Sequence, residues 1–534
     1  MGIGNLVLRV LTTACLIVAG QVAVAATSTA DHSRFEVLQG PFASGEDVTK
    51  ACLSCHTEAA RQVMATRHWT WEYTNPDTGQ KLGKKTMLNG FCIGDRSNEP
   101  FCQSCHIGYG WKDDSFDFTV QTKVDCLACH NTGAYRKLAG FAGHPPYERT
   151  EFPPKSGKFV EATDLAAVAQ AVGPSSRQTC GACHYYGGGG DGVKHGDLDS
   201  SLNKPTRELD VHMAVEGPNF TCATCHQTDK HQVAGSRISM TGADPHGAIR
   251  RGEQSERNPA TCQACHGDRP HDDSLLSQGE RLNDHARTLA CQTCHIPTFA
   301  RGGVPTKMGW DWSTAGKLSA EGKPMQRKDE RGHVIYDSKK GDFVLGENVK
   351  PDYLWFDGKV TYTQPDTRID PSRRVEVNRF HGTPGAPDAR IWPVKTFHGR
   401  QPYDTEHLTL LIPHTATPDD TAFWFNFDWP KALEAGTRAA GQPFSGKFDF
   451  VDTSMLWPIT HMVAPKEKAL ACADCHADEG RLAGVPGVWM PGRDRNVLLD
   501  QLGFGLAGLM LLGVIGHGGL RVLTRKRRKH DGGH

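Results

Sequence analysis

Cysteine and histidine recur along the chain in one fixed pattern, Cys-x-x-Cys-His. The pattern occurs eight times and takes up sixteen of the 18 cysteines. The cysteine pairs are Cys52/Cys55, Cys102/Cys105, Cys126/Cys129, Cys180/Cys183, Cys222/Cys225, Cys262/Cys265, Cys291/Cys294 and Cys472/Cys475. The histidines that end the motifs are His56, His106, His130, His184, His226, His266, His295 and His476. Two thiols at this spacing can form thioethers with the two vinyl groups of one haem, and the histidine then lies under the iron as its proximal ligand. The motifs therefore predict eight covalently bound haem c groups.

Two other chemistries use closely spaced cysteines, but neither explains this pattern. A zinc site built from cysteine pairs does not need a histidine after every pair. A thioredoxin-type dithiol is a single redox centre and does not recur eight times along one chain. Haem attachment accounts for every motif and for the histidine in each.

The second axial ligand decides whether a haem only transfers electrons or also binds substrate. An iron between two imidazoles is coordinatively saturated, whereas one with an open or labile sixth position can bind a small molecule. Eighteen of the 26 histidines are not proximal, and we set aside His32 near the mature start and three histidines at the C-terminus, His517, His530 and His534. We expect the distal ligands mainly from His68, His195, His212, His231, His271, His285, His398 and His461. The reserve candidates are His144, His246 and His381, and any one of these histidines could instead be a surface residue.

One cysteine of the mature chain lies outside the motifs. Cys15 belongs to the expected signal peptide, so Cys92 has no partner for an internal disulfide. It lies ten residues before Cys102, within reach of the second haem. We expect Cys92 to be catalytic there, because a thiolate can attack another sulfur atom by the displacement used in thiol–disulfide exchange. The alternative is a small buried apolar residue between Phe91 and Ile93.

The elements that position these residues follow no fixed repeat. The distance between successive first cysteines varies from 24 to 181 residues, which excludes a solenoid. Seven motifs fall in 26–295, and the eighth, in 472–496, follows a haem-free stretch, 296–471, with probable hairpins. We expect a mainly α fold with extensive loops, wrapped around a haem stack, and a small β-containing insertion that covers it.

The two ends of the chain predict export and membrane anchoring. Residues 1–25 read as a signal peptide that ends in Ala23-Val24-Ala25. Residues 497–522 contain an apolar run long enough to span a bilayer, and the basic tail 523–534 should stay in the cytoplasm. The body would then lie on the periplasmic face of the bacterial inner membrane. The alternative for the apolar segment is a buried C-terminal helix.

Charge excludes one class of partner. Lysine plus arginine equals aspartate plus glutamate, at 60 each, so there is no basic excess for nucleic acid. The membrane segment favours a quinol-oxidising membrane partner, or another electron donor, beside the anchored body.

Several segments resemble the octahaem tetrathionate reductase family of periplasmic cytochromes. The matching segments are Arg67-His68-Trp69-Thr70-Trp71, Gly90-Phe91-Cys92-Ile93, Lys123-Val124-Asp125-Cys126, Lys194-His195-Gly196-Asp197-Leu198-Asp199, Leu282-Asn283-Asp284-His285, Ile296-Pro297-Thr298-Phe299-Ala300-Arg301-Gly302-Gly303 and Phe397-His398-Gly399-Arg400-Gln401-Pro402-Tyr403-Asp404. The resemblance covers nearly the whole exported body. The C-terminal membrane segment departs from the soluble members.

The resemblance implies seven haems with two histidine ligands and one, at His106, with a lysine ligand. The family places that lysine in a segment after the third motif, which makes Lys137 the candidate and Lys123 its rival. A lysine can ligate iron if burial lowers its pKa enough to free the amine.

Three functions compete at this stage. The first is a terminal reductase of a small oxyanion, tetrathionate or else nitrite or hydroxylamine, at the lysine-ligated haem. The second is a membrane-anchored electron conduit without a substrate of its own. The third is a hydroxylamine-type oxidase, which would need a tyrosine cross-linked to haem that the sequence does not identify. The sixth ligand of each iron separates the first two.

Overall fold

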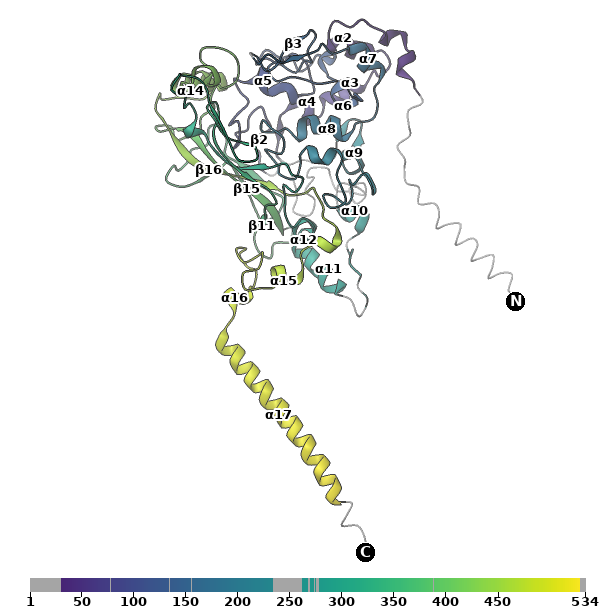
Figure 1. Ribbon diagram of the computed structural model, residues 1–534, viewed down its shortest axis with the longest axis vertical. Helices are drawn as coiled ribbons and strands as arrows, with labels where there is room; N and C mark the ends of the chain where they lie inside the picture. The colour runs from purple at the N-terminus through teal and green to yellow at the C-terminus, as the bar shows by residue number, and fades with distance from the viewer. Residues whose placement is uncertain are drawn as a thin grey trace, which may run out of the picture.

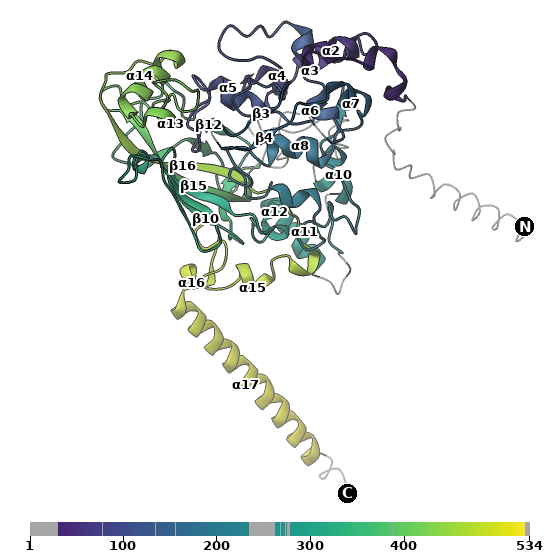
Figure 2. The same ribbon diagram turned by 45° about the horizontal axis from the view of Figure 1, so that its top comes forward.

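A computed structural model describes residues 30–528, except 77, 134, 155, 234–261, 268, 273, 275–277 and 388. The expected signal peptide, the reserve candidate His246 and the last six residues of the expected basic tail lie outside the described residues. Short helices and loops form one side of the body and a sheet forms the other, and one long helix extends away from it (Figures 1 and 2).

The helices that carry the haem motifs are short. Those up to the seventh motif are α2 (Gly45–Leu53), α3 (Ala59–Met64), α4 (Arg67–Thr70), α5 (Glu99–Cys102), α6 (Leu127–His130), α7 (Leu165–Gln170), α8 (Arg177–His184), α9 (Cys222–Cys225), α10 (Cys262–His266), α11 (Gly279–Thr288) and α12 (Cys291–His295). Those that follow are α13 (Phe423–Asn426), α14 (Trp429–Ala440), α15 (Cys472–Cys475), α16 (Pro491–Asp494) and α17 (Val497–Arg528). The 3₁₀ turns are η1 (His32–Arg34), η2 (Glu36–Leu38), η3 (Gln103–Cys105), η4 (Gln121–Lys123), η5 (Ser200–Asn203), η6 (Trp312–Thr314) and η7 (Lys466–Lys468).

A helical turn suits haem attachment because residues three apart share one face. In every motif except the first, the histidine is the last residue of such a turn or the residue directly after it. Local signals set these ends. At α8, the Ser176 side chain accepts a hydrogen bond from the Thr179 amide at 3.2 Å, and the Thr179 hydroxyl accepts one from the Ser176 amide at 2.8 Å. Pro297 lies two residues after the end of α12.

The sheet has eight strands in the order β13-β16-β15-β7-β10-β9-β8, with β11 paired to β15. These strands are β7 (Thr306–Asp311), β8 (Gln326–Lys328), β9 (Val334–Asp337), β10 (Gly341–Gly346), β11 (Asp352–Phe356), β13 (Val375–Glu376), β15 (Arg390–Asp404) and β16 (Phe448–Pro458). Four small ribbons pair β1 (Tyr73–Thr74) with β2 (Lys81–Leu82), β3 (Thr150–Glu151) with β4 (Phe159–Val160), β5 (Thr228–Asp229) with β6 (Gln232–Val233), and β12 (Val360–Tyr362) with β14 (Asn378–Phe380). Strand β15 pairs antiparallel with β16 along the whole of β16 and parallel with β7.

The sheet is larger than the small β-containing insertion expected from the sequence, and the description "mainly α" is correspondingly loose. All eight strands fall between Thr306 and Pro458. The longest strand, β15, was hard to recognise from the sequence. Pro393 and Pro402 interrupt its apolar alternation, and proline normally argues against a central strand. The hairpin strands β9 and β10 were visible in the sequence because their residues are β-branched and aromatic.

The sheet anchors the segment that leads into the second motif. Phe91 is buried with its ring 4.5 Å from that of Phe397 on β15, and its carbonyl accepts a hydrogen bond of 2.9 Å from the Trp312 indole. Burying aromatic rings of this size contributes about 1.5–3 kcal/mol per side chain. Cys92 is therefore held against the sheet by its neighbour Phe91.

Helix α17 stands apart from the body in both views (Figures 1 and 2). Its stretch Val497–Thr524 has a mean hydropathy of 1.8, and none of its apolar window is buried against the protein. By length and composition alone, it is sufficient to cross a bilayer.

Candidate haem sites and the pocket of the second motif

Seven of the eight motif histidines face a second histidine ring. The ring centres of each pair are 6.0–6.5 Å apart. The pairs are His56 with His32, His130 with His231, His184 with His68, His226 with His461, His266 with His212, His295 with His271, and His476 with His285.

This spacing fits one metal ion between two imidazoles. A histidine nitrogen binds a metal at about 2.0 Å, so two ring centres on opposite sides of one ion lie roughly 6 Å apart. The motif cysteines beside each pair supply the two thiols that c-type attachment requires. The residues present therefore fit a haem c at each of these seven positions.

The sequence-based list of distal histidines differs from these pairs at three positions. Six of the expected histidines, His68, His212, His231, His271, His285 and His461, face a motif histidine. His195 instead packs against the Trp457 ring at 5.2 Å, and His398 is exposed on β15. His32, which was set aside for its place near the mature start, faces His56. Its short distance to the first motif was the signal that could have identified it.

The reserve candidates have other contacts. The His144 ring stacks on Tyr109 with centres 5.5 Å apart, and the His381 ring lies 2.9 Å from the Thr361 hydroxyl.

The motif thiols form one continuous branched line through the body. Neighbouring thiols interact in the pairs Cys52–Cys126, Cys129–Cys180, Cys105–Cys183, Cys180–Cys222, Cys225–Cys265, Cys262–Cys291 and Cys294–Cys475. The fourth motif is the junction, since its thiols meet those of the second, third and fifth. The first and eighth motifs are two ends of the line, and the second is a third end.

Cys55, predicted from its motif to bind haem, is exposed rather than enclosed in the body. Cys265 and Cys472 are exposed as well, whereas the other motif cysteines are partly buried. Helix α2 ends at Leu53, so Cys55 falls beyond the helix, whereas the second cysteine of every other motif lies within a helical turn. The first motif joins the line of thiols through Cys52 instead. The structure therefore does not enclose Cys55, and its assignment as a haem-binding thiol stays a prediction of the motif.

His106 of the second motif differs from the other seven. Within the described part of the chain it faces no other histidine ring. Five aromatic side chains surround it, Trp69, Trp71, Trp111, Phe116 and Phe118, and its Nε2 lies 2.7 Å from the Trp69 carbonyl oxygen. Its side chain is fully buried, and burial is the main reason that its pKa falls to about 3. Its Nδ1 is buried without a hydrogen-bond partner. A neutral imidazole of this kind is the form that ligates a metal.

The geometry does not support Lys137 as the sixth ligand of this haem. Its Nζ donates to the carbonyl oxygens of His106 and Gly108, at 2.5 and 3.4 Å, and pairs with Asp125 at 3.0 Å. An ammonium has three N–H groups and no lone pair. These three oxygen acceptors take up all three N–H groups, so the Lys137 amine is not available to iron. The rival Lys123 lies 4.6 Å from the centre of the Phe116 ring.

Four other lysines surround the thiols of Cys92 and Cys102. Lys340, Lys307 and Lys84 all act on the Cys92 thiol, and Lys84 also acts on Cys102. Asp95 lies among them, where it interacts with Lys84 and Lys194. Two further carboxylates act on the same groups, Glu99 on Cys102 and Asp337 on Lys307, so the surroundings of the second motif are rich in lysine and also contain acidic side chains.

The loop Gly187–Gly190 closes this pocket. Gly189 has φ +91°, a conformation that favours glycine, and a side chain at this position would lie 4.0 Å from both Cys92 Sγ and Lys340 Nζ. The thiol and the amine therefore face the same space.

The lysines of the pocket are in different electrostatic environments. Lys84 is exposed, and although desolvation opposes the shift, the neighbouring Asp95 raises the pKa of its amine. Burial, reinforced by Lys340, lowers the pKa of Lys307 well below its usual range. Burial also raises the pKa of Cys92, although the lysines oppose the shift. Burial therefore disfavours the thiolate form that the expected attack by Cys92 requires.

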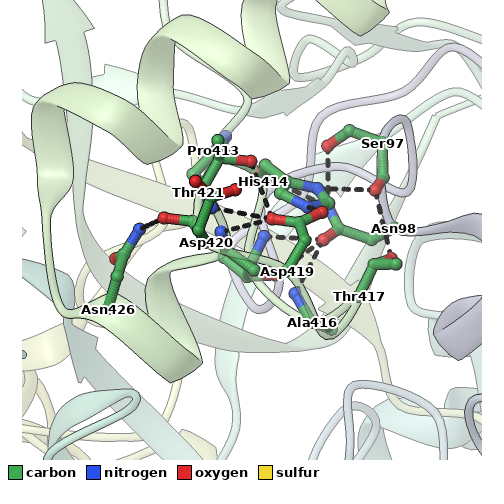
Figure 3. A network of polar contacts seen from close by, with 12 residues as sticks. Ser97, Asn98, Pro413, His414, Ala416, Thr417, Asp419, Asp420, Thr421 and Asn426 are labelled. Atoms are coloured by element: carbon green, nitrogen blue, oxygen red, sulfur yellow. Dashed lines mark hydrogen bonds and ion pairs between the residues drawn. The ribbon is translucent and has the colours of Figure 1, made fainter.

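A polar network holds the entry into the second motif (Figure 3). Asn98 directly precedes α5, and its Oδ1 accepts hydrogen bonds from the Thr415 and Ala416 amides at 2.7 and 3.0 Å. His414 has one ring nitrogen 2.7 Å from the Ser97 carbonyl and the other 2.8 Å from Asp419. The ring therefore links the Ser97 backbone to the Asp419 side chain.

The chain is similar to known cytochromes. A family model described as bacterial cytochrome c matches residues 307–479. An uncharacterised protein from Archaeoglobus fulgidus is 22% identical over 292 residues, which is 45% of this chain and 96% of that protein. The crystal structure of an octahaem cytochrome c from Shewanella oneidensis is 40% identical, with a TM-score of 0.74, and the match covers 87% of this chain and 98% of that one. The chain therefore belongs to the family of c-type multihaem cytochromes that this octahaem protein represents.

Proposed function

We propose that this protein carries eight haem c groups and reduces a small oxyanion at the haem of the second motif. The observation that carries the proposal is the contrast at His106. Seven motif histidines face another imidazole, whereas His106, among the described residues, does not and lies next to a pocket rich in lysine. Haem iron supplies electrons when bound, and an iron without two histidines can also bind substrate.

Lys194 is our candidate for the sixth ligand of this haem. Lys137 has no free lone pair, and Lys84 is held as an ammonium by Asp95. Lys194 follows α8, whose Cys183 interacts with Cys105 of the second motif. The buried Lys395 fixes this segment through hydrogen bonds of 3.0 Å to the carbonyls of Val193 and Lys194.

The lysine-rich pocket favours an anionic substrate. Positive groups in a pocket shielded from water attract anions strongly. Tetrathionate is our first candidate, and two electrons convert one tetrathionate dianion into two thiosulfate dianions without a proton. Nitrite is a further anionic candidate. Hydroxylamine is neutral, so it is a candidate only because it can bind iron directly.

Cys92 has a role in this proposal only for polythionates. Its sulfur would attack a central sulfur of tetrathionate, release one thiosulfate and a proton, and leave a mixed disulfide. Two electrons and one proton would then release the second thiosulfate and restore the Cys92 thiol.

The alternative function is an electron conduit without a substrate. The continuous line of motif thiols and the C-terminal helix favour it, because both suit transfer between the membrane and the far end of the body. Helices α15 and α16 lie beside the start of α17 in both views (Figures 1 and 2), which places the eighth motif nearest to that helix. We propose a quinol-oxidising membrane partner, or another electron donor, at this end.

A single set of variants tests the site. Lys194→Gln should convert one low-spin haem to high spin in low-temperature EPR and change oxyanion reduction, whereas Lys137→Gln should leave the spin state unchanged. Eight low-spin haems each with two histidines in the wild type would reject the reductase and favour the conduit. A high-spin signal in Lys137→Gln would restore Lys137 as the ligand.

A further inference from the structure

Lys137 occupies an unusual position for a lysine that ligates no metal. Its side chain is only 7% exposed, and its partner Asp125 is fully buried. The amine also donates to the carbonyl oxygen of His106, the histidine that ends the second motif. Asp125 directly precedes Cys126, the first cysteine of the third motif. The ion pair therefore lies between two neighbouring motifs and contacts both segments.

Asp125 accepts as many hydrogen bonds as its carboxylate can take. Oδ1 accepts from the Tyr109 hydroxyl at 2.7 Å and the Ala128 amide at 3.0 Å. Oδ2 accepts from the Tyr135 hydroxyl at 2.9 Å and pairs with Lys137 at 3.0 Å. A buried carboxylate is stable only when its oxygens are hydrogen-bonded and its charge is paired, because an unpaired buried charge is strongly unfavourable.

Two neutral tyrosine hydroxyls stabilise the ionised form of the Asp125 carboxylate. Burial and the neighbouring Asp125 raise the pKa of Tyr109 well above its usual range, and burial is also the main reason that the pKa of Tyr135 is raised. Both tyrosines therefore remain neutral donors to Asp125. The only opposing charge within contact of the carboxylate is the Lys137 amine, as far as the described residues show.

We infer that Lys137 and Asp125 are positioning residues that hold the proximal side of the second haem and set its reduction potential as a balanced pair. The amine fixes the backbone at His106 and Gly108, and the carboxylate holds the amine in place. Because the two charges largely cancel, the pair shifts the potential less than either charge alone would. Loss of either member would leave one uncompensated charge in a poorly screened interior next to His106.

The two single variants should shift the potential in opposite directions. Lys137→Gln leaves the carboxylate, which stabilises the more positive oxidised iron, so the midpoint potential of the second haem should fall. Asp125→Asn leaves the ammonium, so the potential should rise. The double variant Lys137→Gln/Asp125→Asn removes both charges and should return the potential close to the wild-type value. The haem should remain low spin in all three variants.

The measurement is a potentiometric titration of the full holoprotein, followed by EPR. The signal of the second haem is first assigned as the one altered by His106→Met. Arg149→Gln, which breaks an exposed ion pair with Glu161, is the matched control and should shift no haem. Shifts of the same sign in both single variants, or a double variant that does not recover, would overturn the inference.

A milder variant tests the inference if Lys137→Gln and Asp125→Asn do not fold. Tyr109→Phe removes one hydrogen bond to Asp125 without changing any charge, so the carboxylate is less well compensated and the potential should fall slightly. A wild-type potential for the second haem in Tyr109→Phe would then reject the inference. Every readout concerns the haem itself, so the result is independent of whether the protein reduces an oxyanion.

Discussion

The imidazole rings of His32 and His56 lie 6.3 Å apart with an angle of 17° between their planes. His32 begins η1, where the preceding Asp31 accepts a hydrogen bond of 3.1 Å from the Ser33 amide. This cap fixes the first described turn of the chain. The first described segment of the chain thereby supplies one half of the expected first haem site.

Replacing His32 should change one haem and no other. We expect His32→Ala to convert a single low-spin signal to high spin in low-temperature EPR, because the iron at His56 would lose its second imidazole. His398→Ala is the control and should give the wild-type spectrum, since His398 is exposed on β15. The reverse result would mean that the ring pairs do not identify the ligands.

The sequence predicted the parts of each haem site that come from neighbouring residues in the chain. A thioether pair and a proximal histidine need only five consecutive residues, so the motifs could be recognised without a fold. The distal ligands are not local: His461 faces His226 and His285 faces His476 across long stretches of chain. Proximity in sequence to a motif identified several of them, but it favoured His195 over His32.

Lys137 shows why nearness to a haem does not define a ligand. The sequence places it seven residues after His130, and the structure does bring it to the backbone of His106. The buried carboxylate of Asp125, twelve residues earlier, captures its amine. A competing acceptor of this kind depends on tertiary packing and has no signature in the sequence.

Cys92 should react slowly at neutral pH. Burial raises its pKa, so the thiolate forms only as the pH rises toward that higher value. We expect alkylation by iodoacetamide, followed by mass spectrometry, to be slow at neutral pH and to accelerate in alkaline solution. Rapid alkylation at neutral pH would show that the thiolate is already present.

The effect of Cys92 on turnover should depend on the substrate. Cys92→Ala should lower tetrathionate reduction by more than about 100-fold if the sulfur forms the mixed disulfide. Nitrite and hydroxylamine reduction should change little, and all haems should remain attached. An equal loss with every substrate would assign Cys92 a structural role at Phe91-Cys92-Ile93.

The contact between His414 and Asp419 should stabilise the entry to the second motif. Asp419→Ala removes the acceptor 2.8 Å from the largely buried His414 ring and should cost about 1–2 kcal/mol in the free energy of unfolding. Chemical denaturation measures this loss, and Asp420→Ala, at the exposed neighbouring position, is the control. A loss in the control as large as that in Asp419→Ala would contradict the proposed contact.

The same contact gives an expected pH dependence. Burial acts to raise the pKa of Asp419, but hydrogen bonds from Thr421 and His414 lower it overall from 3.8. A carboxyl whose pKa is lower in the folded state stabilises the protein above its unfolded pKa. The stabilisation from Asp419 should therefore be complete above pH 3.8, the pKa of the unfolded carboxyl. It should disappear as the pH falls through the lower pKa of the folded state. Asp419→Ala should lack this acid-dependent component.

Removal of α17 should separate membrane attachment from the chemistry of the body. The helix buries none of its apolar window against the protein, so deletion from Leu502 onward removes no part of the core. We expect a folded, red protein in the soluble fraction that keeps dye-linked turnover and loses quinol-linked turnover. The exposed Trp489, 64% accessible and eight residues before α17, would then no longer be held at a membrane interface.

An unrelated membrane helix in place of α17 distinguishes tethering from specific docking. If α17 only holds the eighth motif near the membrane, the substitute should restore most of the quinol-linked turnover. If Gly503 and Ala507 form a close helix–helix contact with the electron donor, the substitute should restore attachment but not turnover. We expect restoration, because isolated small-residue spacing is common in membrane helices and the short connection from α15 to α17 already places the eighth motif at that end. Quinol-linked turnover that survives the deletion unchanged would contradict both forms of the proposal and place the electron donor at another part of the body.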